Sequence, residues 1–440
     1  MNGINKIKNI TLQNYLTNNL VRNFDLRLFR LGILLLAAAP SISFLLLLLS
    51  TFGGLFNRED KFLEDKYSWL LIISSFLMIF NCFLITLDFI KIPELDKSLI
   101  WVGLLNWIPL FWCYWCFQKY LKTKKDRMIC GRLFVIGSLP VLISGFCQNF
   151  LGLYGPYRFL NNLIVWYQRP LGNDGGVSGL FNNQNYAGAW LCIIFPICLG
   201  FLFIKSKDNI LRFINFGLVF SFVIMIILTT SRSAILAIFI SYLISEKFNK
   251  NKFLAIFIFI ISSILLSKIL LLVNIDIQKY ITDYLPSGIF NKFNSFDLSN
   301  IKTLPRFDIW SKSISLIKQN LYFGYGAGSF PKMYQLFNGN FAGIQHTHNI
   351  LLELAFNHGI FVTLFILFTM VNTLISSSKK YLLQNKDRDL TLIDKAWIIS
   401  FANFLIIHMF DITYFDGRIS ILSWTLLAGL RSIAKEKITS

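Results

Sequence analysis

The segment QHTHNILLELAFNHGI, residues 345–360, holds three of the four histidines in the chain. His348 and Asn349 stand directly before ILLELAFNHGI, a stretch typical of a helix. The amino terminus of a helix disfavours a positive imidazolium, so His348 is expected to be neutral and able to accept a proton. We therefore predict that His348 is a catalytic base. A surface loop and a polar first helical turn are the chemically inert alternatives.

His346 and His348 also offer two nitrogen ligands for a metal ion. Zinc needs three or four ligands, usually supported by further hydrogen bonds. Acids occur nearby at Glu353, Asp411 and Asp416, but no spacing picks out a third ligand. The sequence therefore predicts no metal and no cofactor.

Two arginines come at predicted helix starts. Arg232 lies in TTSRSAIL (229–236), where Ser231 can cap the helix. Arg306 opens PRFDIWSKSISLIKQNLYF (305–323), in which Pro305 suits the first turn. Free amides at a helix start favour an anion, so two such sites beside one base suit a diphosphate leaving group and a hydroxyl nucleophile. The alternatives are a snorkelling arginine at a membrane boundary and a solvated surface arginine.

Two further motifs carry no chemistry in this interpretation. GYGAGSF (324–330) is rich in glycine, but no strand precedes it as a phosphate-binding loop requires, so we predict a tight turn. Cys113 and Cys116 form a CxxC inside an aromatic, apolar stretch, where cysteine usually acts as a small hydrophobic residue.

Composition indicates a membrane protein. Of 440 residues, 55% are hydrophobic and only 15% are charged, whereas about a quarter of a soluble domain is charged. Apolar runs of about 20 residues can cross a bilayer as helices.

We predict an all-α fold, a polytopic transmembrane bundle of about twelve helices. Two short ones, 24–39 and 41–56, meet at Pro40, because proline interrupts a helix. The other ten are predicted at 69–90, 99–118, 133–150, 186–204, 210–230, 233–247, 253–273, 359–377, 396–413 and 419–433.

Basic residues in short connectors predict the topology, because they mark the cytoplasmic side. The strongest connector is 119–127, and three others (205–209, 246–252 and 378–389) fall on the same side if the helices alternate. Both termini are then cytoplasmic, and segments 151–185 and 274–347 lie outside. The net charge of +19 is mainly a topology signal and not a nucleic-acid surface.

Three regions follow from this topology. Residues 1–273 hold about nine helices, residues 274–347 form a large outer loop with an amphipathic helix, and residues 348–440 hold about three helices. The apolar face of the amphipathic helix is expected to lie on the bundle or on the lipid surface. That face consists of Phe307, Trp310, Ile314, Ile317 and Leu321, and the opposite face of Asp308, Lys312, Ser315 and Lys318.

The order of the motifs resembles the O-antigen ligase and polymerase superfamily, membrane glycosyltransferases that use lipid-linked sugar donors. The motifs are GLFNNQNYAGAWL (179–191), TSRSA, R-x-x-x-W with LYFGYGAGSF, HN-x9-G and a terminal FDGR, and they cover most of residues 100–430. The stretch GLLNWIPLFW (103–112) is also similar to members from cyanobacteria. The ligase pattern often has a small or polar residue three positions after the glycine of HN-x9-G, where this chain has Val362. That departure concerns the ligase subtype more than the superfamily.

The resemblance implies roles for individual residues. His348, in the motif that Asn349 and Gly359 complete, is implied to be the base that activates the acceptor hydroxyl. Arg232 and Arg306 are implied to bind the donor diphosphate. Substrate-binding positions are implied at Asn349, Asn182, Asn185, Trp310, Gly326, Asp416 and Arg418.

The implied reaction moves an O-antigen-type glycan from undecaprenyl diphosphate to an acceptor hydroxyl, without a metal and with inversion. The acceptor is the lipid A core in a ligase and a second lipid-linked glycan in a polymerase, and a protein is a third choice. The implied partners are these glycolipids and membrane lipids, with no nucleic acid. The site is expected on the periplasmic face of the bacterial inner membrane. A solute or bicarbonate transporter is the alternative of another class, although the few charges within spans lie toward helix ends and no internal repeat is visible.

Overall fold

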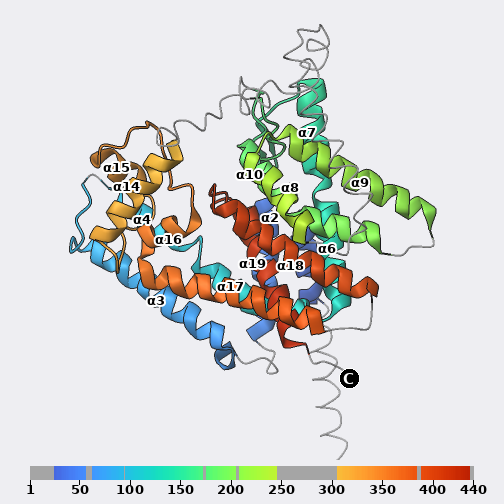
Figure 1. Cartoon of the computed structure of the whole chain (residues 1–440), viewed down its shortest axis with the longest axis horizontal. Helices are drawn as coiled ribbons and strands as arrows, with labels where there is room; N and C mark the ends of the chain where they lie inside the picture. Colours follow the sequence, from blue (N-terminus) through green and yellow to red (C-terminus); the bar gives the residue numbers. More distant parts are fainter. Residues whose placement is uncertain are drawn as a thin grey trace, which may run out of the picture.

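The computed structural model describes residues 24–55, 62–93, 95–171, 175–204, 208–244, 305–383 and 388–436. These residues are mainly helical, as their composition predicts (Figure 1). The predicted helix at 253–273 and the first part of the outer loop, 274–304, lie outside the described residues.

The described helices are α2 (Pro40–Leu55), α3 (Lys66–Thr86), α4 (Lys97–Leu104), α5 (Ile108–Phe117), α6 (Lys124–Gly137), α7 (Leu139–Leu151), α8 (Gln184–Phe203), α9 (Asn209–Leu228), α10 (Arg232–Ile244), α14 (Pro305–Gln319), α15 (Phe330–Leu336), α16 (Ile350–His358), α17 (Ile360–Leu383), α18 (Arg388–His408) and α19 (Gly417–Lys435), with short 3₁₀ turns at Phe62–Glu64 and Gln118–Tyr120. In Figure 1, α14, α15 and α16 gather with α3 and α4, while α8, α10, α18 and α19 form the main bundle. Helix α17 packs against both α3 and α19, so it joins the two groups.

Helix α8 is the centre of the main bundle. Every residue from Ala187 to Phe201 is buried, as expected for a helix that is apolar on all sides. The helix packs against α6, α9, α10 and α18. A polar contact fixes its position against α18, where Asn403 Nδ2 donates to the Cys192 carbonyl oxygen at 2.9 Å. The amino terminus of α8 is therefore held at a defined place at one end of the bundle.

The first apolar stretch is broken as predicted. Residues 24–35 are helical, residues 36–38 form a turn, and α2 begins at Pro40. The two helices pack on each other, because Ser43 Oγ donates to the Gly32 carbonyl oxygen at 2.7 Å. The prediction of two short helices that meet at Pro40 is confirmed.

Six stretches of the described chain are long and apolar enough to cross a membrane: Lys66–Thr86, Lys97–Tyr120, Lys124–Leu151, Gln184–Phe203, Asn209–Leu228 and Ile360–Leu383. Pro40–Phe52 is a shorter apolar helix. The membrane class is thus supported, whereas the predicted number of about twelve spans is not confirmed. Helix α10 is described over Arg232–Ile244, and α18 and α19 bury several polar side chains within the bundle.

A small β-hairpin is an addition to the predicted all-α fold. Strand β1 (Tyr157–Phe159) pairs antiparallel with β2 (Ile164–Trp166), in the predicted outer segment between α7 and α8. Trp166 anchors the hairpin, since its Nε1 donates to the Ala38 carbonyl oxygen at 2.7 Å.

Helix α14 confirms the predicted amphipathic helix, with one polar residue placed differently. Ile317 of the predicted apolar face is buried and Trp310 packs against the same cluster, whereas Phe307 is 48% and Ile314 44% exposed. The prediction was wrong for Asp308, which is buried: its carboxylate accepts from the Tyr334 hydroxyl and from both nitrogens of Asn340. Asp308 was expected to face water, but these contacts hold its side chain inside the cluster of α14, α15 and α16.

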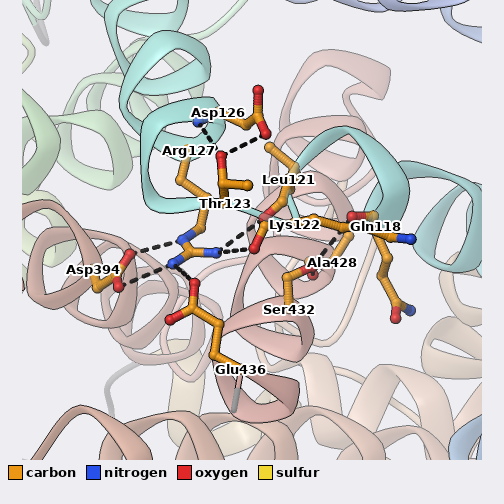
Figure 2. A network of polar contacts seen from close by, with 10 residues as sticks. All are labelled: Gln118, Leu121, Lys122, Thr123, Asp126, Arg127, Asp394, Ala428, Ser432 and Glu436. Carbon is orange, nitrogen blue, oxygen red and sulfur yellow. Dashed lines mark hydrogen bonds and ion pairs between the residues drawn. The ribbon is translucent and has the colours of Figure 1, made fainter. Parts of the chain in front are cut away.

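A buried guanidinium joins three helices at the end of the bundle that carries the predicted cytoplasmic connector 119–127. Arg127 in α6 donates from Nε and Nη2 to the two oxygens of Asp394 in α18, at 2.7 and 3.0 Å (Figure 2). It also pairs with Glu436 and donates to the carbonyl oxygens of Leu121 and Lys122. Arg127 and Asp394 are fully buried, so each depends on the other to satisfy its charge.

Removal of this guanidinium is expected to destabilise the fold. Arg127→Met should lower the free energy of unfolding by about 3–5 kcal/mol, because it leaves the Asp394 carboxylate buried without its cation. Thermal unfolding in detergent measures the loss. Lys125→Ala, an exposed change in the same helix, should leave the midpoint unchanged. The double variant Arg127→Met/Asp394→Leu should recover much of the loss, and a double variant no more stable than Arg127→Met would contradict the pairing.

Candidate functional site

The HN-x9-G motif describes one helix with both of its caps. Asn349 is the N-cap of α16, and its Oδ1 accepts from the amides of Leu351 and Leu352. The nine intervening residues are the whole of α16. Gly359 ends the helix at φ +82°, and a Cβ there would lie 2.0 Å from the Tyr322 carbonyl oxygen. The glycine is thus required by backbone conformation and close packing.

The residues before α16 hold His348 in a left-handed conformation, with φ of 54°. The Thr347 amide donates to Glu353 Oε2 at 2.9 Å, and Asn349 Nδ2 donates to the Met409 carbonyl oxygen at 3.0 Å. A left-handed non-glycine residue is uncommon and needs such surrounding contacts. The loop therefore aims the His348 ring in a fixed direction.

The His348 ring faces a carboxylate from another helix end. Its Nδ1 lies 3.0 Å from Asp411 Oδ1, just after α18. Asp411 Oδ2 accepts from Asn185 Nδ2 at 2.7 Å, and Oδ1 also accepts from the Ile412 amide at 3.0 Å. A carboxylate can only accept, so His348 Nδ1 carries the proton and Nε2 keeps a free lone pair in the neutral ring. The arrangement is that of an oriented base.

Asp411 is an anion at neutral pH. Burial raises its pKa, but the hydrogen bond from His348 and the charges of His348, His346 and Arg306 lower it by more, so the pKa lies below the usual 3.8. The negative charge of this carboxylate stabilises a positive charge on His348 when that ring takes up a proton.

Arg306 lies within electrostatic reach of the same carboxylate, and Arg232 lies within electrostatic reach of Arg306. Burial lowers the pKa of Arg306, the charge of Asp411 raises it and the charge of Arg232 lowers it. Arg306 is partly buried, and Arg232 is exposed in the first turn of α10. Two guanidinium groups against one carboxylate leave a net positive charge, which favours a ligand with more than one negative charge. The structure thus brings together the three residues predicted from the sequence as the reactive group.

His346, His348 and Asp411 are close enough to suggest a metal site, since their ligating atoms lie within 4.8 Å of one another. The hydrogen bonds oppose it. His346 Nδ1 accepts from the His348 amide at 3.3 Å. Burial and the charge of His348 lower the pKa of His346 to about 4, against the opposing charge of Asp411. In this arrangement the ring is neutral with its proton on Nε2, so metal binding by His346 would cost either that proton or the hydrogen bond from the His348 amide.

Asp416 and Arg418 of the FDGR motif are used within the fold. Asp416 caps α19 by accepting from the Arg418 amide at 3.0 Å, and its carboxylate also pairs with the guanidinium. Arg418 further donates to the Leu180 carbonyl oxygen at 3.3 Å and lies 3.8 Å above the Phe181 ring. The motif therefore fixes the segment that leads to Asn182 and Asn185.

Trp310 and Gly326 are placed by packing around α14, α15 and α16. Trp310 packs against the hydrophobic cluster of these helices. The Gly326 amide donates to the Asn357 carbonyl oxygen at 2.9 Å. The segment 324–328 has the turn that was predicted, with left-handed glycines at 324, 326 and 328. No contact in the described chain joins Trp310 or Gly326 to His348.

Sequence reasoning missed two residues of this group. Asp411 and Glu353 were both considered only as nearby acids that could complete a metal site. The signal for Asp411 is an acid directly after an apolar helix, in HMFDITYFDG. Its partnership with His348 joins residues 63 positions apart, which spacing along the chain does not reveal.

Residues 216–367 match the family described as O-antigen ligase. The matched region contains Arg232, Arg306 and His348. The resemblance inferred from the order of the sequence motifs is confirmed. No curated protein matches the chain.

The hydrogen bonds of His346 predict that the purified protein does not hold zinc. After incubation with excess ZnCl₂ and gel filtration, elemental analysis should find well below one zinc per chain. The reason is that ligation by His346 requires the loss of either its Nε2 proton or its bond from the His348 amide. One zinc per chain that disappears in both His346→Ala and Asp411→Asn would instead identify a metal centre.

Proposed function

Since the match over residues 216–367 supports membership of the O-antigen ligase superfamily, we propose that this membrane protein is a glycosyltransferase that uses undecaprenyl-diphosphate-linked glycans. It transfers an O-antigen-type glycan to an acceptor hydroxyl, and the proposed acceptor is the lipid A core. The observation that carries the proposal is the pairing of His348 with Asp411 beside Arg306 and Arg232. A base and two guanidinium groups are what a hydroxyl nucleophile and a diphosphate leaving group require.

The proposed mechanism is a single displacement. The acceptor oxygen attacks the anomeric carbon while His348 Nε2 takes the hydroxyl proton. The bond from the anomeric carbon to the diphosphate oxygen breaks, and its electron pair leaves with the diphosphate. Arg306 and Arg232 neutralise the charge that develops on that oxygen. Asp411 holds the ring and stabilises the imidazolium, and attack from the side opposite the leaving group inverts the anomeric centre.

The site belongs on the periplasmic face in this proposal. Arg232, Arg306, His348 and Asp411 gather at the ends of α10, α14, α16 and α18. The basic connector 119–127 carries Lys122, Lys124 and Lys125, which the positive-inside rule assigns to the cytoplasm. Donors flipped across the inner membrane would then meet the site from outside.

Ligase and polymerase differ in their acceptor, and a gene deletion distinguishes them. Lipopolysaccharide that lacks every O-chain after deletion indicates the ligase. A single repeat on each core indicates the polymerase. An unchanged lipopolysaccharide ladder would contradict both.

His348 is expected to be essential for turnover. His348→Ala should reduce glycan transfer in proteoliposomes by roughly a thousandfold, because it removes the general base. The variant should still insert and fold, because Asn185 and the Ile412 amide continue to donate to Asp411. His358→Phe should keep most of the activity, since His358 is buried within α16 and contributes nothing to the reactive group. Wild-type turnover by His348→Ala would refute the assignment of the base.

Arg306 tests whether a guanidinium is needed rather than a positive charge alone. Its planar donors match two phosphate oxygens, whereas lysine presents a compact point charge. Arg306→Ala should slow transfer by about a hundredfold, and Arg306→Lys should recover only part of that loss. Lys318→Ala, an exposed change near the other end of α14, is the matched control. Full activity in Arg306→Ala would show a solvated surface arginine and reduce the anion site to Arg232.

A further inference from the structure

A polar cavity opens beside the reactive group, at the amino terminus of α8. Its volume is about 240 Å³. It is lined by Arg169, Pro170, Gly175, Gly176, Ser178, Asn182, Asn183, Gln184 and Asn185. Four consecutive residues with side-chain amides, and one arginine, thus line a space of monosaccharide size.

The wall of this cavity is held rigidly by α7. Gln148 Oε1 accepts from the amides of Ser178 and Gly179, both at 3.0 Å, and its Nε2 donates to Ser178 Oγ at 3.2 Å. Gln148 Nε2 also donates to the Arg169 carbonyl oxygen. Gln148 is 1% exposed, so a buried glutamine braces both sides of the cavity before any ligand enters. Such preorganisation is typical of a binding site.

One polar atom of the residues that line the cavity has no partner within the described chain: Asn182 Oδ1 is buried and accepts no hydrogen bond. Asn183 uses its Oδ1 to cap α8. An unsatisfied buried carbonyl oxygen costs free energy unless a ligand or water donates to it. The amides therefore point to a ligand that both donates and accepts hydrogen bonds.

The cavity lies between the base and the turn that carries Arg232. On one side, Asn185 lines the cavity and donates to Asp411, the partner of His348. On the other side, a Cβ at Gly176 would lie 2.5 Å from the Thr229 carbonyl oxygen, three residues before Arg232. The cavity thus shares Asn185 with the Asp411–His348 pair and shares the packing of Gly176 with the turn that leads to Arg232.

We propose that this cavity is a sugar subsite that takes one hydroxyl-rich ring of a glycan substrate. The inference rests on the proposed function and extends it to residues outside the reactive group, namely Arg169, Asn182 and Gln184. Neutral side-chain amides match the alternating donors and acceptors of sugar hydroxyls. Arg169 adds a positive charge, which suits an acidic substituent such as a carboxylate on the ring.

Binding of free monosaccharides tests the subsite without turnover. The probes are glucose, galactose, N-acetylglucosamine and glucuronic acid, each at millimolar concentration with full-length protein in nanodiscs, detected by saturation-transfer NMR. At least one should bind the wild type. Gln184→Ala and Asn182→Ala should each weaken that binding about tenfold, as expected for one lost polar contact. Gln335→Ala, an exposed change in α15, is the control.

Arg169→Ala should weaken the binding of glucuronic acid more than that of the neutral sugars. Arg158→Ala, an exposed change in β1, is its control.

The outcomes separate the subsite from the reaction. The subsite is overturned if none of the four sugars gives a saturation-transfer NMR signal with the wild type. It is also overturned if Gln184→Ala and Asn182→Ala both bind the sugars as the wild type does. His348→Ala should keep wild-type sugar binding while losing glycan transfer. If the wild type binds a sugar but transfers no glycan, and Gln184→Ala weakens that sugar binding, the subsite stands and the proposed function fails. If undecaprenyl diphosphate N-acetylglucosamine displaces the bound sugar, the ring in the cavity belongs to the donor. If the sugar still binds when this lipid is present, the ring belongs to the acceptor.

Discussion

The carboxylate of Asp411 is the interaction on which the functional end of the molecule depends. It joins Asn185 at the start of α8, His348 before α16 and the backbone after α18. Because the group is buried, it must be satisfied by several donors, and those donors come from three separate segments. The need to satisfy one charge therefore fixes the relative positions of the base and the amide-rich start of α8.

The positive charges around Asp411 give this end of the bundle its chemical character. A carboxylate alone would repel a diphosphate, but Arg306 and Arg232 outweigh it. The same carboxylate keeps the His348 proton on Nδ1, so the free lone pair is on Nε2. One anion thus orients a base, while the two cations next to it remain available for a ligand of opposite charge. At the other end of the bundle, Arg127 and Asp394 also pair in the interior, but there each charge is already satisfied by the fold.

Sequence patterns identified elements better than orientations. Helices were correctly placed on both sides of Pro40, and a helix was correctly predicted at 305–323, where α14 covers Pro305–Gln319. The orientation of Asp308 in α14 was wrong, because hydrophobic spacing assumes that charged side chains face water, whereas Asp308 has hydrogen-bond partners inside. The short hairpin at 157–166 was missed, since two strands of three residues leave almost no alternation to recognise.

The sequence by itself determined the membrane class, the helical architecture and the superfamily resemblance, and it predicted His348, Arg232 and Arg306 as candidate site residues. Apolar length, helix-start chemistry and motif order are local properties, so they can be read along the chain. Only the tertiary structure decided that Asp411 and Asn185 complete the base, that FDGR holds the fold together, and that four amides enclose a cavity beside it. Those contacts join residues that are far apart in sequence, and they form only when the packing of α8, α16 and α18 brings buried polar groups to the partners that satisfy them.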